Sequence, residues 1–331
     1  MKTSVPARRR LLGVLSCAVA LGLAAPLAWA QHWPQKPVRI VVHGPAGGSA
    51  DIIARVLADK LTKELGQTVF VEPKPGGLGA VAMQELLSAP RDGHTLLVSA
   101  SSLVSEIPHL AKPRYDPFKD IKPLAELARS GLVLVGNPSV PAKNLSELVA
   151  WAKANPGKLS YASYSTGSIS HTLGLELNKA AGMDMVHVGY KGSPPALQDV
   201  MGGHVQLMFD GPTTSVPMVK GGKLRLFAVS GPKRLGAMPD VPTFAEQGFP
   251  QLDDVVWMGL WVLPDVPAAV QDKLREATLK VLATPAVRDR LLELSLDVGS
   301  GATPEVLAQT LRASYDKQGA TLRALGIKPQ E

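Results

Sequence analysis

Short apolar runs alternate with helix-like segments from Val38 onward. The β-branched run 38–42 predicts a strand, and the glycine-rich residues 44–48 break it before a helix that Ser49 can cap. Further strands are predicted at 68–72 and 95–99, separated by a loop at 73–79, a helix at 79–89 and a turn at 91–93. This alternation predicts a parallel sheet with right-handed crossovers, whose ligands bind at the carboxyl ends of the strands. The first helix ends at Gly66, and its apolar face repeats every three or four positions: Ile52, Ile53, Val56, Leu57, Leu61 and Leu65.

A second series of the same kind follows a strand at 132–135. A helical tail as short as the one after residue 267 rarely builds a core alone, so we expect it to return to the first sheet. The pattern therefore predicts two α/β lobes joined by two crossing segments: a discontinuous lobe of residues 31–135 and 255–331, and a lobe of residues 136–254. The elements of this half are strands at 159–163, 185–188, 205–209, 224–229 and 255–263, a loop at 239–249, and helices at 144–154, 168–181, 195–201, 268–283, 286–294 and 305–325.

The first thirty residues have the three parts of a secretory signal peptide. Basic residues at Lys2 and Arg8–Arg10 precede an apolar run at 11–27, and the small-residue pattern Ala28-Trp29-Ala30 follows. A membrane anchor is the alternative, but polar and helix-breaking residues interrupt the run, which is marginal as a span. We expect cleavage after Ala30 and a periplasmic protein. Paired arginines also occur in twin-arginine signals, yet nothing in the chain demands a cofactor folded before export, and we expect no cofactor.

Cysteine content and charge exclude several classes of function. The single cysteine, Cys17, lies in the predicted signal, so disulfides, cysteine-ligated zinc and cysteine nucleophiles are excluded from the mature chain. Cys17 also lies too early in the apolar run for a typical lipid-attachment site. Four of the 35 basic residues and none of the 28 acidic residues precede residue 31, which leaves 31 against 28, or +3. A net charge of +3, dispersed along the chain, is too small to indicate a protein that binds nucleic acid. It suits a protein whose partner is a small anion.

A set of short motifs runs in order along the chain. The motifs are 33–42, Pro45-Ala46-Gly47-Gly48 with Asp51, 65–67, Pro75-Gly76, 92–97, 115–117, 156–159, Gly167 with His171, Tyr190-Lys191-Gly192, Phe209-Asp210, 222–225, 239–243 and 326–328. This ordered set resembles the solute receptors of tripartite tricarboxylate transporters, the Bug family of bordetellae and related proteobacteria, over essentially the whole mature chain. The resemblance implies the type II periplasmic binding protein fold, with two α/β lobes, a cleft between them and two hinge crossings. It also implies a small organic anion as ligand and inner-membrane transporter subunits as partners.

The first lobe offers one candidate anion site. Gly47 and Gly48 let the backbone approach a ligand closely, and the following helix directs its free amides to the same place. The alternative is a tight strand-to-helix turn without a ligand. The serines that follow the predicted strand at 95–99 are candidates for completing the wall of this site. The candidate ligand-binding residues of the first lobe are Ala46, Gly47, Gly48, Ser49, Asp51, Ser101 and Ser102.

The second lobe offers donors for another part of the ligand. Hydroxyls and amides run from a strand end at Ser163 to a helix start at Ser168, where Ser168 is equally suited to be an N-cap. His171 is equally suited to a packing role, and Lys191 to a solvated position in a loop. Asp210 would repel a second carboxylate and accept from an ammonium or hydroxyl group, unless it only caps the next turn. The candidates are Ser163, Tyr164, Thr166, Gly167, Ser168, His171, Tyr190, Lys191 and Asp210.

One position departs from the family pattern. A proline and an aromatic residue often precede Pro-Ala-Gly-Gly in the family, whereas His43 and Gly44 stand here. The loss of an aromatic wall changes the room and polarity beside the ligand, so the ligand of a relative does not transfer. Tyr164 is a candidate to refill that space, and His43 a candidate to reach an anion.

Two rival functions fit parts of the sequence. A periplasmic hydrolase would use Ser168 or Ser170 with His171, but no nucleophile-elbow motif surrounds either serine. Nucleotide-binding motifs and metal-ligand spacing are also missing from the sequence, so we expect no enzyme, catalytic residue or metal. The other rival keeps the fold but presents the ligand to a periplasmic sensor kinase. We expect a monomer that closes its lobes around a small carboxylate.

Overall fold

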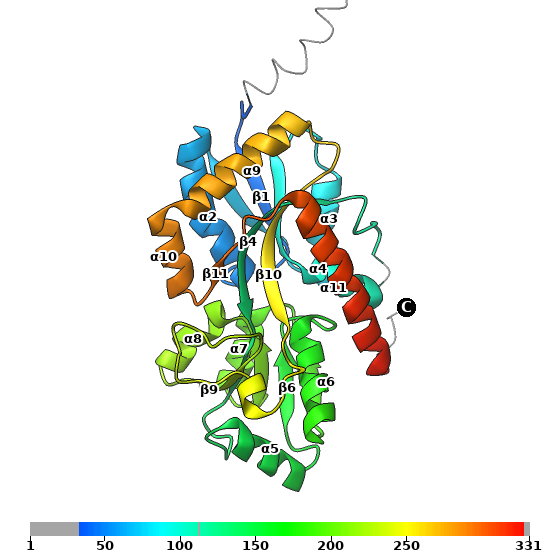
Figure 1. Cartoon of the computed structure of the whole chain (residues 1–331), viewed down its shortest axis with the longest axis vertical. Coiled ribbons are helices and arrows are strands. Elements are labelled where there is room, and N and C mark those ends of the chain that lie inside the picture. Colours follow the sequence, from blue (N-terminus) through cyan, green and yellow to red (C-terminus); the bar gives the residue numbers. More distant parts are fainter. Residues whose placement is uncertain (1–32, 112, 328–331) are drawn as a thin grey trace, which may run out of the picture.

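The computed structural model describes residues 33–111 and 113–327, which form two lobes (Figure 1). Each lobe is built on one sheet. The strand order is β11-β4-β10-β3-β1-β2 in the first lobe and β7-β6-β8-β5-β9 in the second. The predicted signal peptide, residues 1–30, lies outside the described residues. The strands are β1 (Val38–Val42), β2 (Val69–Pro73), β3 (Thr95–Ala100), β4 (Lys122–Gly131), β5 (Val133–Gly136), β6 (Ser160–Ser163), β7 (Val186–Gly189), β8 (Leu207–Asp210), β9 (Arg225–Val229), β10 (Val255–Val262) and β11 (Asp297–Val298).

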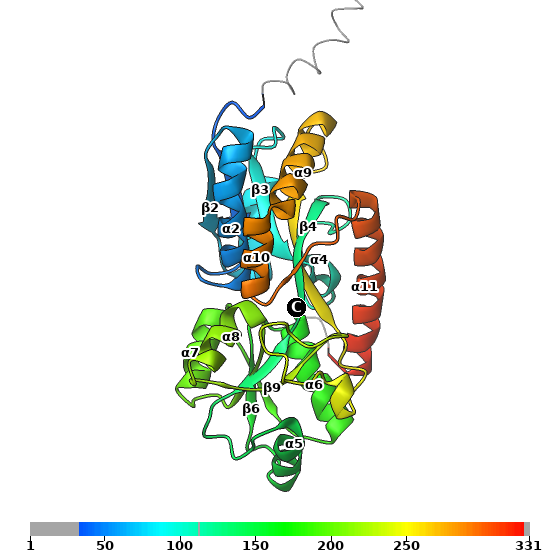
Figure 2. The same ribbon diagram turned by 60° about the vertical axis from the view of Figure 1, so that its left-hand side comes forward.

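In the first lobe the sheet is mixed. Strand β1 is parallel to both β2 and β3, as the alternation of strands and helices predicts, whereas β10 is antiparallel to β3 and β4. The C-terminal helices return to this lobe: α9 packs against α2, and α11 packs against β4 (Figure 2). The helices of the lobe are α2 (Ser49–Leu65), α3 (Ala80–Leu87), α4 (Ser102–Ser105), α9 (Ala268–Ala283), α10 (Pro285–Glu293) and α11 (Pro304–Ala324), with short 3-10 turns η1 (Gly77–Gly79) and η2 (Ile107–His109).

The second lobe buries both faces of its sheet, because successive side chains on each strand point to opposite sides. On β5, Val133 and Val135 belong to the core on one face, and Leu134 belongs to the core on the other. On β8, Met208 and Phe209 divide in the same way. The helices are α5 (Leu145–Ala154), α6 (Ile169–Ala181), α7 (Ser193–Met201) and α8 (Pro212–Lys220), with the 3-10 turn η3 (Ala245–Gln247).

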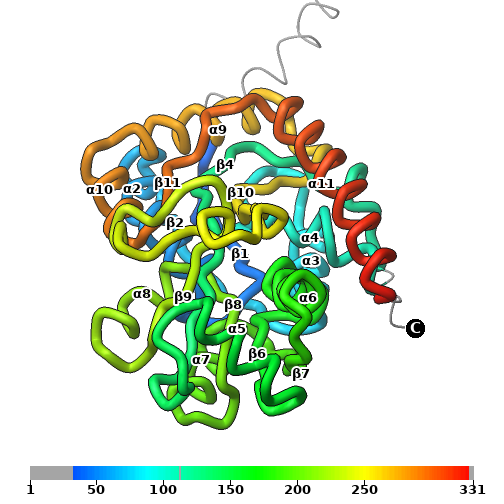
Figure 3. The backbone as a smooth tube through the Cα atoms, turned by 60° about the horizontal axis from the view of Figure 1, so that its bottom comes forward, coloured from blue at the N-terminus to red at the C-terminus, as the bar shows by residue number. Residues whose placement is uncertain are grey.

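Two segments cross between the lobes, one from β4 into β5 and one into β10 (Figures 1 and 3). Ser230 joins them: its hydroxyl accepts a hydrogen bond from the Leu132 amide at 2.8 Å and donates one to the Asp254 carbonyl at 2.7 Å. Ser230 is fully buried, so the hinge is packed without water access at this point. The crossing near residue 132 means that β5 belongs to the second sheet. The predicted boundary at residue 135 is therefore a few residues late, because the sequence of the predicted strand at 132–135 does not show which of the two sheets it joins.

Strand β4, helix α8 and strand β11 are among the elements that the sequence does not predict. Strand β4 contains Pro123, Glu126 and Arg129, which interrupt its apolar pattern; Glu126 is buried and forms an ion pair with the exposed Arg129. Helix α8 begins at Pro212 and contains Pro217, so its sequence resembles a turn. The two-residue strand β11 is too short to leave a pattern.

No helix within the described ranges combines the length and the apolar character that crossing a membrane requires.

Candidate functional site

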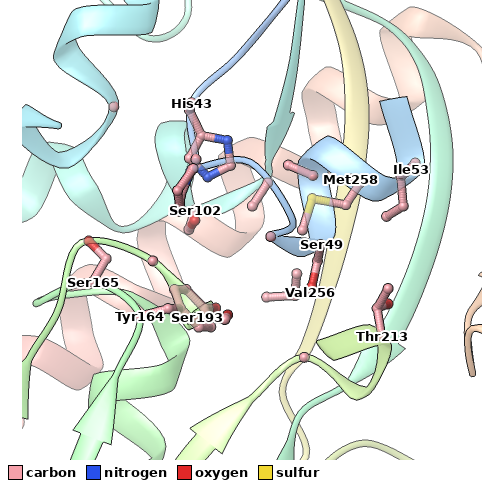
Figure 4. A pocket seen from close by; sticks show the side chains of 18 of the residues that line it. His43, Ser49, Ile53, Ser102, Tyr164, Ser165, Ser193, Thr213, Val256 and Met258 are labelled. Carbon is pink, nitrogen blue, oxygen red and sulfur yellow. The ribbon is translucent and has the colours of Figure 1, made fainter. Parts of the chain in front are cut away.

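A cavity of about 300 Å³ lies between the lobes (Figure 4). Its wall is formed mainly by segments that follow the carboxyl ends of strands. In the first lobe these are the turn after β1 with the start of α2, the glycine turn 76–79, and Ser102 after β3. In the second lobe they are residues 164–165 after β6, 190–193 after β7 and 211–213 after β8. The end of β4 and the start of β10 close the cavity on the hinge side.

Three helices begin at this cavity. The first residues of α2, α7 and α8 are Ser49, Ser193 and Pro212, and all three line the wall together with the glycine before each of them. The first amides of a helix have no partner inside it and carry partial positive charge. Their convergence makes the cavity favourable for an anion.

Three polar atoms in the wall are buried and have no hydrogen-bond partner among the described residues. They are His43 Nδ1, the Tyr164 hydroxyl and Thr213 Oγ1. Leaving a buried polar group unpaired costs about 1–3 kcal/mol. Burial raises the pKa of Tyr164, with further contributions from Glu106 and Asp210, so its hydroxyl remains a donor at neutral pH. These atoms are therefore suited to hydrogen-bond a polar ligand.

The charge of the wall also favours an anion. Among the described residues that line the cavity, none is an aspartate or glutamate, and two are basic, Arg129 and Lys191. Arg129 is paired with Glu126, its Nη2 lying 2.7 Å from Oε2. Lys191 is exposed and makes no ion pair within the described chain. Burial lowers the pKa of His43, partly offset by a hydrogen bond with the backbone of Val98, so His43 is neutral at pH 7.

The lobes touch on more than one side of the cavity. A Cβ placed on Gly192 would lie 2.4 Å from Cγ of Pro45, and one on Gly211 would lie 2.8 Å from the Ser49 hydroxyl. Farther from the hinge, Leu110 of the first lobe packs directly on Gly167 of the second. The two lobes are therefore in direct contact around the cavity.

Six of the sixteen candidate binding residues line the cavity: Gly48, Ser49, Ser102, Tyr164, Tyr190 and Lys191. His43, which replaces the usual residue of the family pattern, lines it as well. Tyr164 reaches the wall from the second lobe and lies beside Ser193 (Figure 4). The hydroxyl of Tyr190 is already engaged, because it donates to Asp199 Oδ2 at 2.6 Å.

Four first-lobe candidates lie outside the cavity wall. Ala46 and Gly47 are exposed at the outer side of the turn, and Gly47 has a φ of +76°. Asp51 fixes that turn: its Oδ2 accepts from the Gly47 amide at 2.9 Å, and Arg55 holds the same carboxylate. The Ser101 amide donates to the carbonyl of Trp257 at 2.9 Å and ties β3 to β10. These residues therefore hold in place the backbone that forms the cavity wall.

Five second-lobe candidates form a packed layer behind the wall. The hydroxyl of Ser163 forms a hydrogen bond with Nε2 of His187 at 2.7 Å. The ring of His187 stacks on that of His171, with ring centroids 3.7 Å apart. Burial lowers the pKa of His171 to about 4, and burial with its neighbour lowers the pKa of His187 to about 3. Both rings are therefore neutral and structural. His171 Nδ1 accepts from the Gly167 amide, the Ser168 hydroxyl donates to the Ser165 carbonyl, and Thr166 lies against Gly189.

Asp210 is fully buried and does not reach the cavity. It accepts hydrogen bonds from the hydroxyls of Ser193, Thr214 and Ser215, the last two at 2.6 Å. Burial raises the pKa of Asp210, and these hydroxyls oppose the shift. Its hydrogen bonds fix the starts of α7 and α8, both of which line the cavity.

Sequence reasoning missed several lining residues. Ser193 and Thr213 occupy strand-to-helix turns of the same kind as the one before Ser49, and that similarity is the signal that could have found them. Ile53, Val256 and Met258 line the cavity from elements interpreted only as core. No local pattern distinguishes them from other apolar residues of α2 and β10.

The fold and the site together define a two-lobed solute-binding protein. Residues 53–327 match the model of the tripartite tricarboxylate transporter family receptor, and the chain belongs to that family. A relative from Cupriavidus necator, a UPF0065 protein from the gbd 5′ region, is 36% identical over 320 residues, covering 95% of this chain and 96% of the relative. The family places the protein outside the cytoplasm as a periplasmic solute-binding receptor.

Three solved structures share the whole fold. The periplasmic binding protein BugD is 30% identical, with a TM-score of 0.85 over 90% of this chain and 100% of that one. An R. palustris protein with adipate is 26% identical, with a TM-score of 0.87 over 90% and 100%. MatC from Rhodopseudomonas palustris with bound malate is 30% identical, with a TM-score of 0.82 over 88% and 100%. The type II periplasmic binding fold is thus confirmed, and the family and these neighbours are solute-binding proteins rather than enzymes.

Proposed function

We propose that this protein captures a small carboxylate in the cavity between its lobes and delivers it to a tripartite tricarboxylate-type transporter. The observation that carries the proposal is the convergence of three helix starts and three unpartnered buried polar atoms on one cavity without acidic residues. The adipate and malate bound to two structural neighbours support the same ligand chemistry.

The carboxylate meets donors from both lobes. The first lobe offers the start of α2 and the hydroxyls of Ser49 and Ser102, and the second offers the hydroxyls of Tyr164 and Thr213. A hydrogen bond to a charged group contributes about 1.5–3 kcal/mol. Three or four such bonds support micromolar binding, since a Kd of 1 μM corresponds to about −8.2 kcal/mol.

Binding is coupled to closure because the donors are divided between the lobes. In an open form a ligand would contact only one lobe, so the closed form binds it more tightly and the ligand shifts the population toward closure. The contacts of Pro45 with Gly192 and of Ser49 with Gly211 complete the wall only in the closed form. Closure also brings the outer surfaces of both lobes together as one surface for the membrane subunits.

Binding is tested by thermal shift and calorimetry on purified protein, freed of any co-purified ligand by unfolding and refolding. The panel contains mono-, di- and tricarboxylates and amino acids. A ligand at about 100 times its Kd stabilises the folded protein by about 2.7 kcal/mol. Thr213→Val should weaken binding of a hit about tenfold or more, because it removes a hydroxyl from the wall. The matched control is Thr310→Val on the exposed side of α11, which should bind normally. No hit across the panel, or equal effects of both substitutions, would contradict the proposal.

Delivery is tested separately by uptake of the identified ligand in a strain lacking this gene. Loss of uptake that is restored by the wild-type gene supports transport. Unchanged uptake together with a lost transcriptional response would instead indicate a receptor for a sensor kinase.

A further inference from the structure

Two segments that line the cavity also meet outside it. In the first lobe, residues 102–110 run from α4 through η2, and Ser102 and Ile107 of this segment line the cavity. In the second lobe, the turn after β6 places Tyr164 and Ser165 in the wall. Figure 4 shows Ser102 across the cavity from this turn. Each segment continues beyond the wall to residues that contact the other lobe.

Leu110, at the end of the first-lobe segment, contacts Gly167 of the second lobe. Gly167 has a φ of +83°, and a Cβ added to it would overlap Cδ1 of Leu110 and lie 2.9 Å from its Cγ. Because Gly167 has no side chain, it leaves a recess that the leucine fills. Neither residue is among those that line the cavity. This contact therefore joins the lobes at a place separate from the ligand.

The burial of Leu110 does not come from the core of either lobe. Leu110 is only 3% exposed, yet it belongs to none of the clusters of buried apolar side chains found among the described residues. Ile107, one turn earlier, belongs to the core of the first lobe. Apolar surface that is buried where two bodies meet favours their association. Leu110 therefore favours contact between the lobes more than the folding of one of them.

A polar contact on the same two segments reinforces this junction. Glu106 accepts a hydrogen bond from the Ile169 amide, at the start of α6, at 3.3 Å. Each segment is also held by its own lobe. His109 Nε2 forms a hydrogen bond with a backbone carbonyl of α11 at 2.8 Å, and the Gly167 amide donates to His171 Nδ1 at 3.1 Å. Because both segments are held in place, separating the lobes would break the leucine contact and the glutamate contact together.

We infer that Leu110 is a positioning residue for ligand capture, which stabilises the closed arrangement of the lobes by packing on Gly167 and does not touch the ligand. This inference rests on the proposed function and adds to it. Because the proposed capture requires closure, the apparent Kd equals the intrinsic Kd divided by the closed fraction. Loss of the contact lowers that fraction and raises the Kd of every ligand by the same factor. The residues of the cavity wall then determine which ligand binds, and Leu110 determines how firmly the lobes hold it.

Leu110→Ala tests the inference by calorimetry on the refolded protein with succinate, malate, adipate, citrate, hexanoate and benzoate. The variant should bind the acids of this set about tenfold more weakly than the wild type, which corresponds to about 1.4 kcal/mol, with the ratio of any two Kd values unchanged. The matched control is Leu292→Ala on α10, where the leucine is 56% exposed, and it should bind as the wild type does.

Two outcomes would overturn the inference and leave the proposed function intact. An unchanged Kd in Leu110→Ala would mean that the contact does not stabilise the closed arrangement. A changed ratio between acids would mean that Leu110 takes part in ligand recognition. Failure of all six acids to bind the wild type would overturn the proposed function and, with it, this inference.

Two further measurements separate this role from a role in folding. Without ligand, Leu110→Ala and the control should melt at the same temperature, because a protein whose lobes open does not depend on the contact. A clearly lower melting temperature, or failure to fold, would assign Leu110 to the stability of the first lobe and overturn the inference. Gly167→Ala should also weaken binding, because its Cβ fills the recess. The double variant should bind about as weakly as Gly167→Ala alone, since both substitutions remove one contact. Additive effects would contradict a direct contact.

Discussion

Glu106 is a buried carboxyl group that joins the lobes. It follows α4 in the first lobe, and its Oε2 accepts a hydrogen bond from the Ile169 amide of α6 in the second lobe at 3.3 Å. Its Oε1 accepts from the Ser105 hydroxyl at 3.1 Å. The negative charge of Asp254 disfavours the charged form of Glu106. Glu106 in turn raises the pKa of Tyr164. Burial, reinforced by Asp254, raises the pKa of Glu106 to about 8.

This raised pKa makes the stability of the protein depend on pH. The unfolded chain loses the Glu106 proton near pH 4.5, whereas the folded protein keeps it until about pH 8. The folded protein therefore holds more protons in this window, and its stability falls as pH rises through it. Each pKa unit corresponds to about 1.36 kcal/mol, so the difference of about 3.5 units sets an upper limit of about 5 kcal/mol lost by pH 9.

Glu106→Gln should remove this loss. The amide keeps an oxygen for the Ile169 N–H and cannot ionise. Urea unfolding of both proteins at pH 5, 7 and 9 measures the difference, with Glu276→Gln on the exposed face of α9 as the matched control. We expect the free energy of unfolding of the variant, relative to that of the wild type, to rise by about 2 kcal/mol or more between pH 5 and pH 9. Parallel pH profiles of wild type and variant would refute the buried, protonated state of Glu106.

Two further predictions concern the contacts that hold the closed form. Gly192→Val should weaken ligand binding at least tenfold, because its Cβ would overlap Pro45 and keep the lobes apart; calorimetry with unchanged affinity would contradict the closed geometry. Ser230→Ala should lower the free energy of unfolding by about 1–3 kcal/mol, because the buried Leu132 amide and Asp254 carbonyl lose their partner. Urea unfolding showing no loss for this variant would mean that the two crossing segments are not joined through Ser230.

Elements with regular apolar patterns were predictable from the sequence. The run 38–42 became β1, and the spaced apolar residues before Gly66 became α2, because burial on one face requires that spacing. Strand β4 was not predictable in the same way. Its Glu126 is buried by virtue of Arg129 and Ser300, and Ser300 lies far away in the sequence. A buried carboxylate that receives hydrogen bonds from a residue far away in the sequence looks like a surface residue when the sequence is read alone.

The site was predictable where it depends on local backbone. Gly48 and Ser49 were found because a glycine turn between a strand and a helix creates a binding point by itself. His171 illustrates the opposite case. Its position beside a serine-rich turn suggested a ligand contact, but its ring is committed to His187 and the Gly167 amide. Which of two neighbouring side chains faces the cavity depends on packing between β6 and β7, which the sequence does not display.

Capture by closure is tested most directly by small-angle X-ray scattering of the purified protein, first without ligand and then saturated with the tightest ligand of the carboxylate panel. Ligand-driven closure of the lobes predicts a smaller radius of gyration with ligand, and a ligand-bound curve that matches the structure described here. Wild-type dimensions that stay the same with and without a tightly bound ligand would contradict it.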